Sequence, residues 1–111
     1  MQYFRHQRVE SLIQEELGKI LEREVEVPGA LLTITRISVA KKLDRAEVWV
    51  SILPSDKAEE AMKILKRSAS DIQHKLLITI NIRPMPFLDF KLDRGPEKAA
   101  AIEKILLKED G

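Results

Sequence analysis

The first fifth of the chain carries an apolar stripe with helical spacing. Apolar residues recur three and four positions apart from Val9 to Leu21, and most charged residues of this segment fall between them. This pattern predicts a helix from about Tyr3 to Arg23. The tripeptide Val27-Pro28-Gly29 then ends the helix, because proline blocks its continuation and glycine permits a turn.

The segment Leu32–Val39 is rich in β-branched residues and predicts a strand. Its two halves disagree in phase, however, since Leu32 and Ile34 alternate out of step with Ile37. Two explanations remain open. Either a β-bulge lies near Thr35-Arg36, or the regular strand starts there.

The segment Ala46–Ile52 alternates strictly between apolar residues and others, so it predicts a second strand with one buried face. Trp49 falls on the opposite face of this strand. The intervening run Lys41-Lys42-Leu43-Asp44-Arg45 is then the turn of a hairpin.

The central part of the chain predicts two helices that meet at small residues. Pro54-Ser55-Asp56 ends the hairpin, and an apolar stripe then runs from Ala58 to Leu76. The stripe passes through Ser68-Ala69-Ser70, which we interpret as a helix junction lying on the sheet. We extend the second helix through the ambiguous apolar run to Ile80.

A third strand, Phe87–Leu92, lies after Pro84 and Pro86, and an amphipathic helix is predicted after Pro96. The order is helix, strand, strand, helix, helix, strand, helix. This order predicts an α+β fold with a three-stranded sheet and helices on one face. Its first six elements are in the order of a type II KH domain, and we expect residues 1–111 to form one such domain with an additional C-terminal helix.

Composition narrows the class of protein further. The net charge of +1 is too balanced to indicate nucleic-acid binding by itself, so any basic surface must come from local segregation of cations. The chain has no cysteine, which excludes disulfides and thiol catalysis. No signal peptide or membrane span is evident, and we expect a soluble, cytoplasmic protein.

The residue patterns do not favour an enzyme. His6 and His74 each stand alone, with no carboxylate at metal-ligand spacing, and no glycine-rich phosphate loop or Gly-x-Ser-x-Gly elbow is present. We therefore expect no catalytic residues, no metal, no cofactor and no small-molecule substrate.

Cations around the helix junction suggest a polyanionic partner. Lys66 and Arg67 precede the small residues and Lys75 follows them, and small side chains allow close approach to a backbone. A plain helix junction with solvated lysines is an equally simple explanation, and spacing alone slightly favours it. Arg5 and Arg8 begin the first helix, where the helix dipole disfavours cations.

Four segments in this order and spacing resemble the bacterial ribosome-binding factor A family, over nearly the whole chain. They are Arg8-Val9 with Glu16-Leu17 and Ile20-Leu21, the run Thr33–Val39, the run Leu43–Leu53, and the run Arg83–Asp93. The resemblance implies a type II KH fold without the usual Gly-x-x-Gly loop, in which two helices meet at an Ala-x-Gly kink. Ser68 and Ser70 stand where the family has alanine and glycine, which implies a smaller bend or more nearly continuous helices.

The resemblance also implies a function. It is that of a non-catalytic assembly factor that binds the immature small (30S) ribosomal subunit through 16S rRNA and assists its late maturation, including 5′-end processing. A monomer is expected. The candidate RNA-binding residues are Arg5, Arg8, Lys41, Lys42, Arg45, Lys66, Arg67, Ser68, Ala69, Ser70 and Lys75.

Two other functions stay open on the residues. One is a KH-like regulator that binds single-stranded RNA. The other is a protein-interaction module that uses the open sheet face around Trp49, although packing against neighbouring strands is the commoner role of such a tryptophan.

Overall fold

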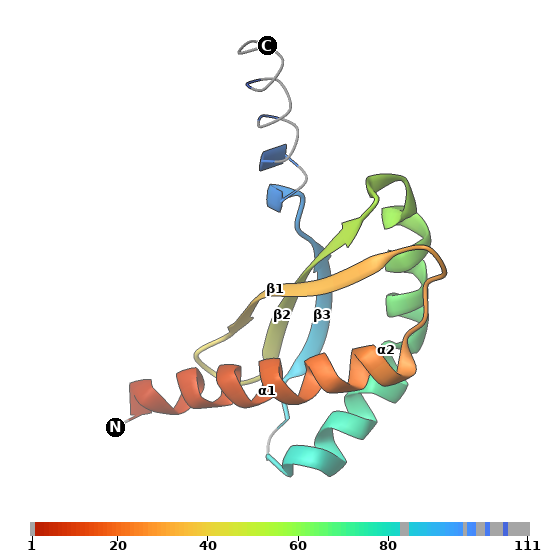
Figure 1. Cartoon of the computed structure of the whole chain (residues 1–111). Helices are drawn as coiled ribbons and strands as arrows, with labels where there is room; N and C mark the ends of the chain where they lie inside the picture. Colours follow the sequence, from red (N-terminus) through yellow and green to blue (C-terminus); the bar gives the residue numbers. More distant parts are fainter. Residues whose placement is uncertain (1, 83–84, 97, 100–101, 103–105, 107–111) are drawn as a thin grey trace.

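The segments with strong apolar periodicity form the elements that they predict (Figure 1). The structure is a computed structural model that describes residues 2–82, 85–96, 98, 99, 102 and 106, with side chains from residue 7 onwards. The elements are α1 (Gln2–Glu24), β1 (Leu31–Val39), β2 (Arg45–Leu53), the short 3-10 helix η1 (Ser55–Lys57), α2 (Ala58–Ile80) and β3 (Phe87–Leu92).

The three strands form one sheet in the order β1-β2-β3. β1 runs antiparallel to β2, whereas β3 runs parallel to it, with α2 in the crossover connection that a parallel pair requires. The apolar face of β2, including Val48 and Val50, is fully buried beneath the helices. The predicted α+β fold, a three-stranded sheet with its helices on one face, is therefore confirmed.

A β-bulge at Thr35 resolves the phase conflict in β1. Ile34 pairs with Val50 and Arg36 pairs with Trp49, so Thr35 is an extra residue without a partner in the ladder. The extra residue shifts the phase by one position. Apolar residues on both sides of the bulge therefore face the helices, and the bulge is the correct one of the two explanations.

The two helices predicted around Ser68-Ala69-Ser70 are one continuous α-helix of 23 residues, so the prediction of separate helices is wrong. Continuity, the alternative implied by the missing glycine, is what the structure shows. α2 contains neither glycine nor proline, so nothing interrupts its backbone hydrogen bonds. Its axis nevertheless changes direction near the middle, at its label in Figure 1.

The helices and the apolar sheet face enclose one core. From α1 it includes Ile13 and Leu17, and from α2 it includes Leu65, Ile72 and Leu76, all almost completely buried. α2 ends at Asn81, which adopts the left-handed conformation, and its N–H donates to the Leu77 carbonyl at 2.9 Å. The segment to Ile80 is therefore helical, as predicted.

The predicted final helix falls only partly on described residues. Gly95, Pro96, Lys98, Ala99, Ile102 and Leu106 are helical. The other positions of this prediction lie outside the described residues, as do Arg83 and Pro84.

Candidate nucleic-acid interface

The N-terminal half of α1 lies beside the β1–β2 turn. The Val39 N–H donates to the Glu10 carboxylate at 3.1 Å, which ties α1 to the end of β1 (Figure 1). The turn is closed by a bond from the Ala40 N–H to the Arg45 carbonyl at 2.9 Å. The Phe87 N–H donates to the Asp44 carbonyl at 3.0 Å, so β3 starts at the same place.

Four candidate cations gather at this end of the molecule, which we call the basic end. They are Arg8, Lys41, Lys42 and Arg45, and each is exposed. None of the four has an ion-pair partner among the described residues. The backbone of Arg5 belongs to α1, but its side chain lies outside the described part of the chain.

The opposite end carries the loop after α1, η1 and the start of α2, and it is rich in acids. Gly29 lies near Lys57, since a Cβ added to Gly29 would be 3.9 Å from the lysine Cε. The acids of these segments and of the last turn of α1 are Glu22, Glu24, Glu26, Asp56, Glu59 and Glu60. The near-zero net charge therefore hides a segregation of charge between two ends.

The candidate cations of α2 are separate from the basic end. Lys66 and Arg67 are exposed, and within the described residues neither has an ion-pair partner. Lys63, one turn earlier, is paired with Glu59 at 3.8 Å. Lys66 and Arg67 thus form a second, smaller group with charge available to a polyanion.

Lys75 is already engaged within the protein. Its Nζ donates to the Glu24 carboxylate at 2.7 Å and so joins α2 to the end of α1. This hydrogen bond and the lysine charge hold the pKa of Glu24 below its usual value. A phosphate would have to compete with Glu24 for Lys75, which makes Lys75 a weaker candidate than Lys66 or Arg67.

The three small residues at the middle of α2 are only partly accessible. Ser68 and Ala69 are half-buried, and Ala69 packs against the core. Ser70 is exposed. Of the three candidate contacts, Ser70 is thus the most exposed residue.

Side chains on the open face of the sheet already contact one another. The Arg36 guanidinium lies over the Trp49 ring, 4.9 Å from its centroid, which is a cation–π geometry. Lys91 lies between two acids, 3.7 Å from Glu47 and 3.8 Å from Asp89. Trp49 therefore packs against a neighbouring strand side chain, and a base could stack on this side of the ring only if Arg36 moved.

A carboxylate joins the bulge of β1 to the segment after β3. The Thr35 hydroxyl donates to Asp93 Oδ2 at 2.7 Å, and the Gly95 N–H donates to Asp93 Oδ1 at 2.8 Å. The pKa of Asp93 lies below its ordinary value of 3.8, and the hydrogen bond from Thr35 is the largest cause. The hydrogen bond from Gly95 and the charge of Arg36 lower the pKa further. The bulge thus has a local role, which is to present this hydroxyl.

Replacing Thr35 by valine is expected to raise the pKa of Asp93 toward 3.8, because valine keeps the shape but cannot donate a hydrogen bond. Since the folded-state pKa is depressed, the contribution of Asp93 to stability is present above pH 3.8 and is lost as the pH falls through the lower folded-state pKa. NMR titration of the carboxyl carbon measures the shift. Thr33→Val, two residues away, is the control and should leave the pKa of Asp93 unchanged. An unchanged pKa in Thr35→Val would contradict the assignment.

Comparison with known proteins decides the family. The model of the family described as Ribosome-binding factor A matches residues 5–106. The chain belongs to the ribosome-binding factor A family. A ribosome-binding factor A from Chlorobium luteolum is 39% identical over an alignment of 113 positions, gaps included, which covers 96% of this chain and 95% of that protein. One from Opitutus terrae is 34% identical and covers 89% of this chain and 82% of that protein.

Solved structures of the ribosome-binding factor A family share the fold. The crystal structure from Thermus thermophilus has a TM-score of 0.69 at 22% identity, covering 79% of this chain and 94% of that one. The solution NMR structure of a Thermotoga maritima protein, described as a putative ribosome binding factor A, has a TM-score of 0.67 at 25% identity, covering 79% and 86%. A Thermus thermophilus homology model fitted into a cryo-EM map of a 30S complex with the factor has a TM-score of 0.65 at 23% identity, covering 78% and 92%.

These relatives are named for binding to the ribosome and not for a reaction. Within the described residues, no three His, Asp or Glu side chains are grouped so that they could hold a metal ion. None of the helices described here is long and apolar enough to cross a membrane.

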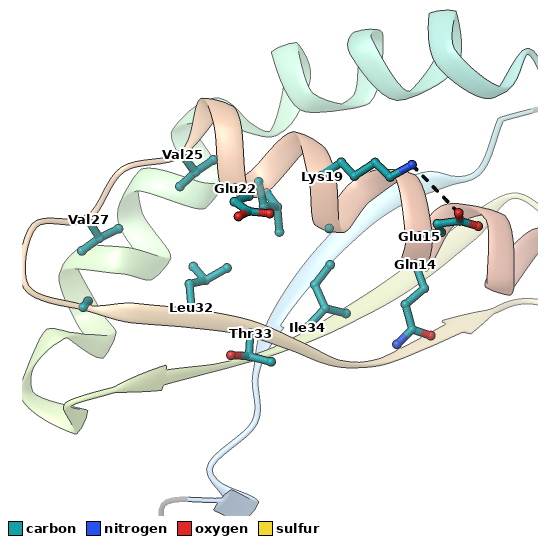
Figure 2. A pocket seen from close by; sticks show the side chains of 12 residues that line it. Gln14, Glu15, Lys19, Glu22, Val25, Val27, Leu32, Thr33 and Ile34 are labelled. Atoms are coloured by element: carbon teal, nitrogen blue, oxygen red, sulfur yellow. Dashed lines mark ion pairs between the residues drawn. The ribbon is translucent and has the colours of Figure 1, made fainter.

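A groove that the sequence did not predict lies between α1 and β1 (Figure 2). It is lined by the second half of α1, the loop after it and the first half of β1. The basic end is at the other end of β1, so the groove is separate from the larger group of candidate RNA contacts. No sequence signal pointed to it, because the groove depends on how α1 packs beside β1, the next element along the chain.

Proposed function

We propose that this member of the ribosome-binding factor A family is a cytoplasmic, non-catalytic assembly factor that binds the immature 30S subunit through 16S rRNA. It acts as a monomer and as a single KH-like domain spanning residues 1–111. It assists late maturation of the subunit, including 5′-end processing of 16S rRNA, and needs no cofactor.

The observation that carries this proposal is family membership over residues 5–106. The Thermus thermophilus factor, which shares the fold, has been fitted into a map of its 30S complex. The charge distribution supports the same partner, because cations without internal acid partners are what a phosphate backbone attracts. The basic end supplies four such cations, and Lys66 and Arg67 supply two more.

The proposed contacts differ in how much each is expected to contribute to RNA binding. The basic end and Lys66 with Arg67 bind phosphates directly. Arg5 extends the basic end along α1, and Lys75 contributes only if it leaves Glu24. Ser70 can donate to a phosphate oxygen, whereas Ser68 and Ala69 mainly shape α2.

The two other functions are less well supported by the geometry. A protein partner on the open sheet face would have to displace Arg36 from Trp49 and meet acids that already hold Lys91. A regulator of single-stranded RNA would use the same cations, and binding assays with short single strands distinguish it from a factor that prefers precursor subunits.

Reversal of charge at Lys66 and Arg67 to glutamate is expected to weaken binding to precursor subunits without unfolding the protein. Each lost phosphate contact flattens the dependence of log affinity on log salt by roughly 0.7 to 0.9, so two lost contacts flatten it by about 1.5. Co-sedimentation with precursor subunits over a series of salt concentrations measures the slope.

The matched control is Lys57→Glu with Lys63→Glu, two cations of the same region that are paired with Glu60 and Glu59. This control changes the net charge by the same amount as the Lys66 and Arg67 variant, and it should change the slope of log affinity against log salt less. An equal effect of both double variants would show that overall charge, and not these two side chains, governs binding. An unchanged slope in the Lys66 and Arg67 variant would remove them from the contacts.

A further inference from the structure

The groove between α1 and β1 has an apolar floor beside a strand. Its volume is about 530 Å³, and Leu21, Val25, Leu32 and Ile34 line it. Figure 2 shows Leu32 and Ile34 pointing from β1 toward α1, whereas Thr33 points away. Gly18 of α1 also lines the groove, and a Cβ added to it would meet no atom within 4 Å. The groove therefore has room for one or two apolar side chains next to the strand.

The strand beside the groove has a free edge. β1 is the outer strand of the sheet and pairs only with β2. The Val39 N–H at this edge is taken by Glu10. Backbone N–H and C=O groups along a strand point alternately toward the partner strand and away from it. Because the bulge adds one residue, Leu32 and Ile34 have the same phase as Val39, and their backbone groups point away from β2 toward the free edge.

The part of the edge next to the groove is unprotected. Natural proteins blunt exposed edges with lysine, proline or a covering segment. The run Leu31–Ile34 has no lysine and no proline, and 65% of Leu31 is exposed. An unprotected, β-branched edge beside an apolar slot is the arrangement that binds an added strand.

The rim of the groove is acidic. Its single cation among the lining residues is Lys19, which lies 3.4 Å from Glu16 and 3.9 Å from Glu15. Glu22 also lines the groove, and no described cation forms an ion pair with it. The rim therefore attracts a basic segment. A second copy of this chain would bring the same acids to its partner's edge, which disfavours pairing of two β1 strands.

We infer that this groove binds an extended basic segment of a partner protein, which adds a strand to the edge of β1 and inserts an apolar side chain between α1 and β1. The acidic rim favours a basic segment over nucleic acid. Because the basic end lies at the other end of β1, the groove adds a second surface to the proposed RNA-binding one. A partner protein and RNA can then be held together.

The test is an NMR titration of the isolated full chain, so it does not depend on ribosome binding. The probe is the synthetic peptide Ac-Lys-Val-Lys-Val-Lys-Ile-Lys-NH₂, and its acidic counterpart has glutamate at each lysine position. The basic peptide is expected to shift the amide signals of Leu32 and Ile34 and to slow their hydrogen exchange. The acidic peptide should bind at least ~10-fold more weakly.

Two test variants, each with a control variant, locate the binding. Gly18→Leu fills the groove, and leucine favours a helix more than glycine does, so the variant folds. It should weaken peptide binding at least ~10-fold, because the apolar anchor loses its pocket. Ser11→Leu introduces the same side chain at an exposed position of α1 outside the groove and should leave binding unchanged. Glu22→Lys should weaken binding, whereas Asp71→Lys on α2 should not.

Several results would overturn the inference. One is equal binding of the basic and acidic peptides, and another is equal binding by wild type and Gly18→Leu. Peptide-induced shifts on the open sheet face instead of β1 would place the contact elsewhere. Concentration-dependent shifts of Leu32 and Ile34 without peptide would assign the edge to a second copy of the chain.

Discussion

Replacing Leu65 by alanine is expected to lower the free energy of unfolding by about 2 to 5 kcal/mol, the usual range for leucine truncation in a core. Leu65 has no exposed surface and projects from α2 into the single core. Its neighbours one turn away on the same face, Ala61 and Ala69, are too small to fill the space that truncation leaves. The cavity therefore persists, and its cost adds to the lost burial.

Urea unfolding followed by circular dichroism measures this change. The m-value, which is the slope of the free energy of unfolding against urea concentration, should stay unchanged. The control is Ile78→Ala on the same helix, where 68% of the isoleucine is exposed. That variant should change stability by less than about 0.5 kcal/mol. If both variants cost the same, α2 would contribute through helix formation and not through the packing of Leu65.

The sequence predicted most of the fold because apolar periodicity dominates it. β3 was predicted with its observed bounds, and α1 to within one residue at each end. In β1 the two-residue period of the apolar residues revealed a change of phase along the strand, but it did not reveal the cause of that change. A bulge and a late strand start bury similar residues, and only the pairing with Val50 and Trp49 distinguishes them.

The error at α2 has a different origin. The three small residues at Ser68-Ala69-Ser70 were interpreted as a junction between two helices, whereas the absence of the family's glycine pointed to continuity. Serine and alanine both continue a helix, and the apolar stripe had already predicted one unbroken face from Ala58 to Leu76. The local pattern was therefore the better guide to continuity.

Candidate contacts could be named from the sequence, but their availability could not. Lys75 looked equivalent to Lys66 until the structure placed it against Glu24, 51 residues away. The bond between Thr35 and Asp93 spans 58 residues. Contacts of this kind decide which charges are free for a ligand, and no spacing rule at the level of local sequence reports them.

The separation of charge bears on the proposed binding of RNA by a nearly neutral chain. Cations outnumber acids at the basic end, where Glu10 and Asp44 lie beside the four cations, so a phosphate that approaches this end meets a net positive charge within a screening length of about 8 to 10 Å. On the proposed function, the acids at the other end would repel RNA and so favour an approach by the basic end. Removing the basic end should therefore have a larger effect than removing the same number of cations elsewhere.

Replacement of all four basic-end cations, Arg8, Lys41, Lys42 and Arg45, by glutamine is expected to flatten the salt dependence of 30S-precursor binding by roughly 3. At low salt the affinity should fall about 100-fold or more, because four counterion-releasing contacts are lost together. These side chains are exposed and have no ion-pair partners among the described residues, so the fold should not change. Co-sedimentation at several salt concentrations measures both quantities.

The matched control replaces four paired cations, Lys19, Lys57, Lys63 and Lys91, by glutamine. Both variants change the net charge from +1 by the same four units. Exposed ion pairs contribute about 0 to 1 kcal/mol each, so the control should remain folded. Its slope should stay near that of the wild type, since its cations are already neutralised by acids. Equal loss in both variants would mean that net charge alone drives binding and that the position of the basic end is irrelevant.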